Sequence, residues 1–471
     1  MAERPPSAEP ERTYVGPRDE RPRTTLAPVR AAPATDCPVG PQAAAGGRLA
    51  ELSLFSRTLF YLHDRYPGDM TPRSRQLLLA ALAALPPADG DVAVERDAET
   101  PPLWVNVTVK GERCTLNLER AHTPGDMRST LRDAMRFIGS RAASPADEAE
   151  ARFTRLELAA TNGMLAALDR QSVLMDADSY GKLGPNATGA SASAVLDPQG
   201  RDARPVAFAG PHAGEVAYLS LDGFPRGAGA EVQQASLGSG GAPPKGIILD
   251  LRHNKGGLVD EAARVADVFI ERGVLGWIVG RRERTALEAQ DSGQDFAGAV
   301  VVLVNHETAA AAELVASAIQ NLGRGVIVGE ATAGAGSVRT FFELPRNWRP
   351  ATAGSPPAPP DRDAVAGILD GVGAPSPGHE AEPLAAEPKE VLGLLLRTGY
   401  LRTANDRELE GAGVRPDVEL PRAASAASAA GDACVVQLAQ ALISQAPDGR
   451  RSTLLAMARG LAHTHDCAQA P

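Results

Sequence analysis

The chain has 471 residues, of which 43% are apolar, and a formal net charge of −10. This length suffices for two or three domains with a large core, and the acidic balance argues against binding to nucleic acid or to an anionic membrane surface. We find neither a secretory signal nor an apolar stretch long enough to span a membrane, so we expect a cytoplasmic protein. The four cysteines, Cys37, Cys114, Cys434 and Cys467, fit neither metal-ligand spacing nor a disulfide framework, and we expect no metal and no cofactor.

The N-terminal third divides into a tail and a small domain. Residues 1–48 are rich in Pro, Arg, Ala and Glu and lack periodicity, which is typical of a disordered tail. Residues 49–140 predict a small, largely helical α+β domain, in which Thr71 and Pro72 mark a helix start. Its expected elements are two helices within residues 50–85, a hairpin of Trp104–Val109 and Arg113–Leu118, and a helix over Asp126–Ile138.

The remaining segments outside the centre are predicted as follows. Residues 144–168 begin with a capping-box-like sequence and predict a helix. Residues 188–214 are a Gly-, Ala- and Pro-rich linker, shorter than the roughly 40 residues that an independent domain needs. Residues 346–389 predict an exposed loop. Residues 421–471 predict a linker and two short helices, Cys434–Ile443 and Thr453–Ala462, for docking or self-association.

The central residues 246–344 alternate between apolar strands and amphipathic helices, which is typical of an α/β layer fold. The expected strands are Ile247–Leu251, Val300–Val304 and Val326–Gly329. One helix follows Leu258 and ends before Gly273. A second is expected over Ala309–Leu322, with Thr308 as its N-cap.

This central region resembles a known family. LDLRHNKGGLVDEAARVADVFI is similar to the signature DLRxNxGGxxxEAxxxADxF of the tail-specific, or C-terminal-processing, serine peptidases. The family's next two motifs fall on Asn305–Glu313 and Gly329–Arg339, and the resemblance covers residues 159–420. It implies a crotonase/ClpP-like peptidase core over residues 144–420, with the short segment 188–214 where the family has a PDZ domain.

Aligned with these motifs, the chain departs from the family at the catalytic positions. Ala310 stands where the family has its nucleophilic serine, Ala335 where it has its general-base lysine, and Arg339 where it has a supporting glutamine. An alanine methyl can neither attack a carbonyl carbon nor accept a proton, and an arginine remains protonated. The resemblance therefore implies a pseudoprotease with no intact catalytic residue.

Other residues of these motifs retain possible roles. The N–H groups of Gly256, Gly257 and Ala311 are candidates for an oxyanion hole. Thr308, His306 and Ser337 are candidates for a replacement active site. A general base must lie within hydrogen-bond distance of its nucleophile, however, and residues adjacent in sequence, such as His306 and Glu307 beside Thr308, usually point in different directions. Arg339 offers a cation that can pair with a peptide carboxylate.

We therefore expect a non-catalytic homologue that binds a protein or peptide in the former active-site groove, or that associates with an active relative or with itself and regulates it. One alternative is an active serine-type endopeptidase that cleaves protein C-terminal regions through displaced catalytic residues. Another is a small-molecule binding protein, because retinoid-binding proteins of the eye resemble the same module.

Overall fold

The computed structural model describes Cys37 and residues 52–69, 73–96, 104–141, 146–175, 207–212, 216–238, 243–291, 293, 295–345, 391–420, 429–446 and 448–461. The rest of the expected tail, Thr71 and Pro72, most of the expected linker and the insertion 346–389 lie outside these residues. Within the described ranges, no helix is both long enough and apolar enough to cross a membrane.

A six-stranded sheet forms the core of the larger, C-terminal part of the molecule, in the order β14-β11-β10-β7-β6-β5. Its strands are β5 (Ala207–His212), β6 (Val216–Ser220), β7 (Gly246–Asp250), β10 (Ala299–Val304), β11 (Val326–Gly329) and β14 (Val418–Glu419). All pairs are parallel except β5 with β6. The inner strands β7, β10 and β11 are buried along their whole length, as parallel strands covered on both faces should be. The expected α/β core is confirmed, whereas β5 is a strand within the segment that the sequence predicted as a linker.

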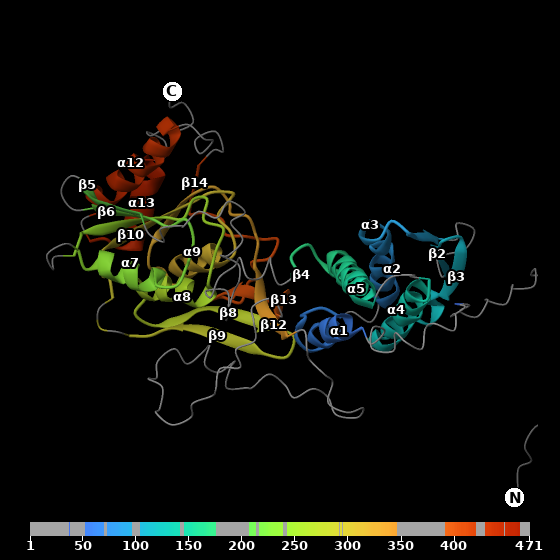
Figure 1. The fold of residues 1–471 in the computed structure, drawn as a ribbon. Coiled ribbons are helices and arrows are strands. Elements are labelled where there is room, and N and C mark those ends of the chain that lie inside the picture. The colour runs from blue at the N-terminus through green and yellow to red at the C-terminus, as the bar shows by residue number, and fades with distance from the viewer. Residues whose placement is uncertain are drawn as a thin grey trace, which may run out of the picture.

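Helices cover both faces of this sheet (Figure 1). The helices α7 (Ala228–Ser236), α8 (Val259–Asp267) and α9 (Ala311–Asn321) pack on one face, and α12 (Ala429–Gln445) and α13 (Arg451–Leu461) on the other. Leu438 and Leu442 of α12 are buried with Ile248 and Leu303 of the sheet. These C-terminal helices are therefore part of the core rather than a free docking segment, because the second face of a parallel sheet must also be covered. The helix α7 lies within residues 227–244, a segment that is looser in sequence than the helix that the family has there.

A second, antiparallel sheet lies beyond α8 and α9 (Figure 1). It consists of β12 (Ser337–Pro345), β13 (Val391–Thr403), β8 (Gly273–Gly280) and β9 (Arg284–Ala289), and the short β4 (Val173–Met175) also pairs with β13. Val338 and Leu401 of this sheet belong to the same core as α8 and α9. The long strand β12 starts directly after the loop that contains Ala335, so this sheet continues from the candidate site.

The N-terminal region packs against the far end of β12 and β13. It contains α1 (Ser53–Arg65), α2 (Ser74–Ala83), α3 (Leu85–Ala88), α4 (Pro124–Gly139) and α5 (Ala146–Leu168), the hairpin of β2 (Trp104–Val109) and β3 (Glu112–Asn117), β1 (Val92–Arg96) and the 3-10 turn η4 (Leu118–Arg120). The predicted hairpin and the predicted helix before residue 140 are confirmed. The helix α5 packs on α1 and α2, and one apolar core runs from these helices to Leu394 and Leu396 of β13.

A buried carboxylate joins α5 to α1. Glu157 is 5% exposed, and its Oε1 accepts the N–H groups of Leu54, at 2.8 Å, and Phe55, at 3.1 Å. These groups are in the first turn of α1, where N–H groups lack partners within the helix. Burial raises the pKa of Glu157 to about 7, and the two N–H groups oppose that rise.

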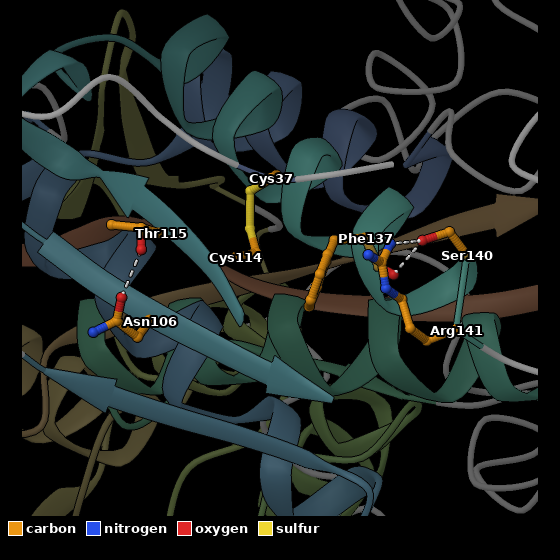
Figure 2. The surroundings of a disulfide bond; sticks show 7 residues. All are labelled: Cys37, Asn106, Cys114, Thr115, Phe137, Ser140 and Arg141. Atoms are coloured by element: carbon orange, nitrogen blue, oxygen red, sulfur yellow. Dashed lines mark hydrogen bonds between the residues drawn. A yellow bond between two sulfur atoms is a disulfide. The ribbon is translucent and has the colours of Figure 1, made fainter. Parts of the chain in front are cut away.

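A disulfide bond corrects one expectation from the sequence. Cys37 is bonded to Cys114 of β3, 77 residues away, and their Cα atoms are 4.3 Å apart (Figure 2). Cys434 is also disulfide-bonded. Cysteine spacing could not predict the first pair, because the fold alone brings the two residues together. Disulfides persist mainly in oxidising compartments, which contrasts with the cytoplasmic location expected from the sequence.

Candidate functional site

Three loops meet at the carboxyl ends of β7, β10 and β11, the edge at which open α/β sheets bind their ligands. They are the loops 251–258, 305–310 and 330–336. The N–H of Ala309 donates to the carbonyl of Asn254 at 2.9 Å, and the N–H of Ala333 donates to the carbonyl of Thr308 at 2.9 Å. Backbone hydrogen bonds thus fix the middle loop to both of its neighbours.

Ala310, at the position of the family's nucleophile, has a strained backbone. Its φ is 54° and its ψ is −119°, a combination that residues with a side chain rarely adopt. It precedes the first residue of α9, so the expected helix start at Ala309 and the expected N-cap role of Thr308 are both wrong. The sharp turn resembles the strained turn that exposes a nucleophile at a helix start in α/β-hydrolases, but here it presents only a methyl group.

Glu313 brings the two altered catalytic positions together. Its Oε2 accepts the N–H groups of Ala310, at 2.9 Å, and Ala335, at 2.8 Å, so these two residues are neighbours through one oxygen atom. Its Oε1 accepts the N–H of Gly334 at 2.7 Å and the hydroxyl of Thr332. The side chain is fully buried, and burial raises the pKa of Glu313 although all four donors oppose the rise.

Two of the three expected oxyanion-hole donors remain available. The N–H of Gly256 donates to Oδ1 of Asn254 at 2.8 Å and is therefore occupied. Among the described residues, the N–H groups of Gly257 and Ala311 have no acceptor. Gly256 also sets how closely the loops approach, because a Cβ atom there would lie 2.8 Å from Cβ of Ala310. The backbone can thus offer two donors beside Ala310.

The candidate replacement residues do not form a catalytic group. Thr308 is fully buried, and its hydroxyl donates to the carbonyl of Leu251 at 2.8 Å and accepts the N–H of Asn305 at 3.0 Å. Nδ1 of the His306 ring lies 2.8 Å from Oε2 of Glu330, so this nitrogen contacts Glu330 rather than Thr308. Ser337 is 7% exposed and donates to Oε2 of Glu410 at 3.0 Å. Each hydroxyl is therefore held by a structural acceptor.

The rim of the site carries charged groups. His253 has a left-handed φ of 65°, and its Nδ1 lies 3.2 Å from Oε2 of Glu307. Nζ of Lys255 lies 3.4 Å from the same oxygen. The hydrogen bond from His253 and the charge of Lys255 lower the pKa of Glu307. These contacts connect the loop 251–258 to the loop 305–310.

Arg339, at the position of the supporting glutamine, is a half-buried residue of β12. Burial lowers its pKa, and the nearby carboxylate of Asp169 opposes that effect. No group of three side chains suited to a metal ion occurs in the described ranges. The three loops therefore offer two backbone donors beside a carboxylate whose two oxygens are already occupied.

The sequence predicted that Ala310, Ala335 and Arg339 share one site, but it did not reveal that Glu313 joins the first two. Glu313 and Thr332 belong to motifs that resemble the family's, and this was the only signal for them. Nothing in the sequence indicated that the Gly256 N–H donates to the Asn254 side chain, because this hydrogen bond depends on the loop conformation.

Comparisons with known proteins find a matching family and several relatives. Residues 215–420 match the model of peptidase family S41. A carboxy-terminal-processing protease of Bartonella bacilliformis is 34% identical over 140 residues, which are 28% of this chain and 32% of that protein. A chloroplastic C-terminal processing peptidase of Tetradesmus obliquus is 35% identical over 131 residues, 28% of each chain. The chain thus spans less than a third of either relative's length.

Among solved structures, the chain is similar to a photosystem II D1 C-terminal processing protease. The identity is 24% and the TM-score 0.35, over 53% of this chain and 54% of that one.

Proposed function

Because residues 215–420 form a domain of peptidase family S41, we propose that this domain is a pseudoprotease, which holds a peptide or an unfolded protein segment beside Ala310 without cleaving it. The relatives are named for processing protein C-termini, so their ligands are polypeptides. A homologue that keeps the surrounding loops but lacks the reacting groups retains the means to position such a chain.

The observation that supports this proposal is the pair of methyl groups at the two catalytic positions. Ala310 and Ala335 donate to the same oxygen of Glu313, so the frame for a nucleophile and a base is present while both reactive groups are absent. By analogy with serine hydrolases, losing nucleophile and base together lowers turnover about a millionfold. Thr308 and Ser337 do not compensate, because their hydroxyl groups already donate to Leu251 and Glu410.

The test measures retention and cleavage in the same reaction. The chain is immobilised and incubated with β-casein, an unstructured protein. Retention is measured from the eluted casein, and cleavage by mass spectrometry of the supernatant. We expect retention without cleavage. The double variant Ala310→Ser with Ala335→Lys should cleave, because the frame places both side chains in one site.

A matched control is the single variant Ala310→Ser, which regains a hydroxyl but no base and should remain inactive. Cleavage by the unaltered chain that disappears in Thr308→Ala would show that a replacement nucleophile exists and would overturn the proposal. Absence of both retention and cleavage would overturn the peptide-holding role.

A further inference from the structure

The helix α1 joins the N-terminal region to the antiparallel sheet. It packs against β13, and the ring of Tyr61 lies on the ring of Phe342 in β12, with 4.4 Å between the ring centres. Just beyond the end of α1, the carbonyl of Gly68 accepts a hydrogen bond from Nη1 of Arg281 at 2.7 Å. The strand β12 starts directly after the loop that contains Ala335. The position of α1 therefore determines how firmly the N-terminal region is attached to the strand that continues from the candidate site.

The first turn of α1 depends on a cap from another helix. Leu52, the residue before α1, has a left-handed φ of 49° and supplies no side-chain cap. The N–H groups of Leu54 and Phe55 instead donate to Oε1 of Glu157 in α5. N–H groups in the first turn of a helix have no partner within it, so they need an acceptor of this kind. Closing α1 against α5 therefore requires the carboxyl group of Glu157 to leave water.

Glu157 is arranged as a neutral acid would be. Both N–H groups meet one oxygen, and no described residue donates to Oε2. A buried carboxylate without donors on both oxygens is costly in its ionised form, whereas a proton on Oε2 removes that cost. Burial raises the pKa of Glu157 to about 7, and the two N–H groups are the only other influence on it. No charged side chain of α1, α2, α4 or another described element thus acts on this carboxyl group.

A second buried group weakens the closed position of α1. Thr58 lies in the middle of this helix and is fully buried, and its hydroxyl has no hydrogen-bond partner in the described ranges. A buried hydroxyl without a partner costs free energy that is regained when the helix opens to water. Segments with such costs can open locally while the rest of the protein stays folded. The helix α1 thus combines an unsatisfied hydroxyl with a cap that can be ionised.

From these contacts we propose that α1 is a pH-sensitive latch, which detaches from α5 and β12 more often as Glu157 loses its proton. The latch is independent of the proposed function, because no ligand takes part in it. When α1 opens, the carboxyl group reaches water and returns to its ordinary pKa of 4.5. The closed state holds the proton more tightly, so its advantage is complete below pH 4.5 and is lost as the pH rises through about 7. Between pH 6 and pH 8, this linkage increases the open fraction about tenfold.

Hydrogen exchange of the full chain, followed by mass spectrometry at pH 6 and pH 8, tests the latch. Exchange rates are divided by the intrinsic rates at each pH, so that only the opening of the structure is compared. Peptides from α1 report the latch, and peptides from α4 in the same region and from β10 in the six-stranded sheet serve as references. We expect α1 to open more often than both references at pH 8, and its opening to increase about tenfold from pH 6 to pH 8.

Two variants identify the group responsible. Glu157→Gln keeps an oxygen that can accept both N–H groups but has no proton to lose in this pH range, so the opening of α1 should become the same at both pH values. Glu150→Gln alters an exposed acid of the same helix and should retain the increase.

The results that would overturn the latch are distinct. If α1 of the unaltered chain opens equally at both pH values, Glu157 does not control it. A pH dependence that persists in Glu157→Gln would assign the effect to another group. Opening of α1 and α4 at the same rate would mean that the N-terminal region unfolds as a whole rather than through α1.

Discussion

Glu157 in the N-terminal region and Glu313 beside the candidate site are both buried carboxylates that accept N–H groups at the start of a helix. They differ in how many oxygens they use. Glu157 receives both of its N–H groups on Oε1, whereas Glu313 receives two donors on each oxygen and joins two loops from different strands. Glu157 therefore acts as a cap that an uncharged acceptor can replace, and Glu313 acts as a junction that needs both carboxylate oxygens.

The largest effect is expected at the junction. Glu313→Gln keeps the shape of the side chain, but its amide nitrogen is a donor and must face two of the four donors that surround it. Leaving two buried donors without acceptors should lower the free energy of unfolding by about 4 kcal/mol. Urea denaturation followed by circular dichroism measures this loss of stability.

The matched control is Glu157→Gln at pH 5. It should lower the free energy of unfolding by less than about 1 kcal/mol, because one oxygen accepts both N–H groups there. Similar losses in both variants would refute the distinction.

The second effect is a pH dependence specific to Glu157. Its folded-state pKa of about 7 lies above the ordinary value of 4.5, so the folded protein binds the proton more tightly than the unfolded chain. This contribution to stability is present in full below pH 4.5 and is lost as the pH rises through about 7. Glu157→Gln lacks it, so between pH 4.5 and 8 the variant should gain about 2 to 3 kcal/mol relative to the unaltered chain.

Urea denaturation of both proteins across this pH range measures the gain. Taking the difference between them cancels the parallel contribution of Glu313, whose pKa is also raised. A constant difference would mean that Glu157 is not protonated in the folded protein.

The smallest effect concerns the backbone that Glu313 holds in place. Ala310→Gly replaces the strained residue with the one that tolerates its φ of 54° and ψ of −119°, and it should raise the free energy of unfolding by about 1 kcal/mol. The control Ala312→Gly, in the first turn of α9, should instead lower it by a similar amount or more, because it also removes a buried methyl group. A loss of stability in Ala310→Gly would indicate that the turn is not strained.

The sequence predicted the parts of the fold that depend on local pattern. Buried strands such as Val326–Gly329 are apolar throughout, and the resemblance to the peptidase motifs predicted that Ala310, Ala335 and Arg339 share one site. It could not predict the opposition of Arg339 and Arg397, because that depends on strand register across a long insertion. The sequence also did not predict the Cys37–Cys114 bond or the burial of the Thr308 hydroxyl. In both cases the partner lies on a segment distant in sequence.

The helices α12 and α13 begin after residue 420, where the family match ends, yet they cover one face of the six-stranded sheet from β6 to β14. The part of the chain that folds as one unit therefore extends beyond the residues that match the family. A chain shortened at residue 420 would leave Ile248, Val301, Leu303 and Val328 facing water, and a continuous apolar surface of this kind promotes aggregation. Recombinant work on the peptidase-like domain should therefore keep residues 429–461, although they lie outside the family match.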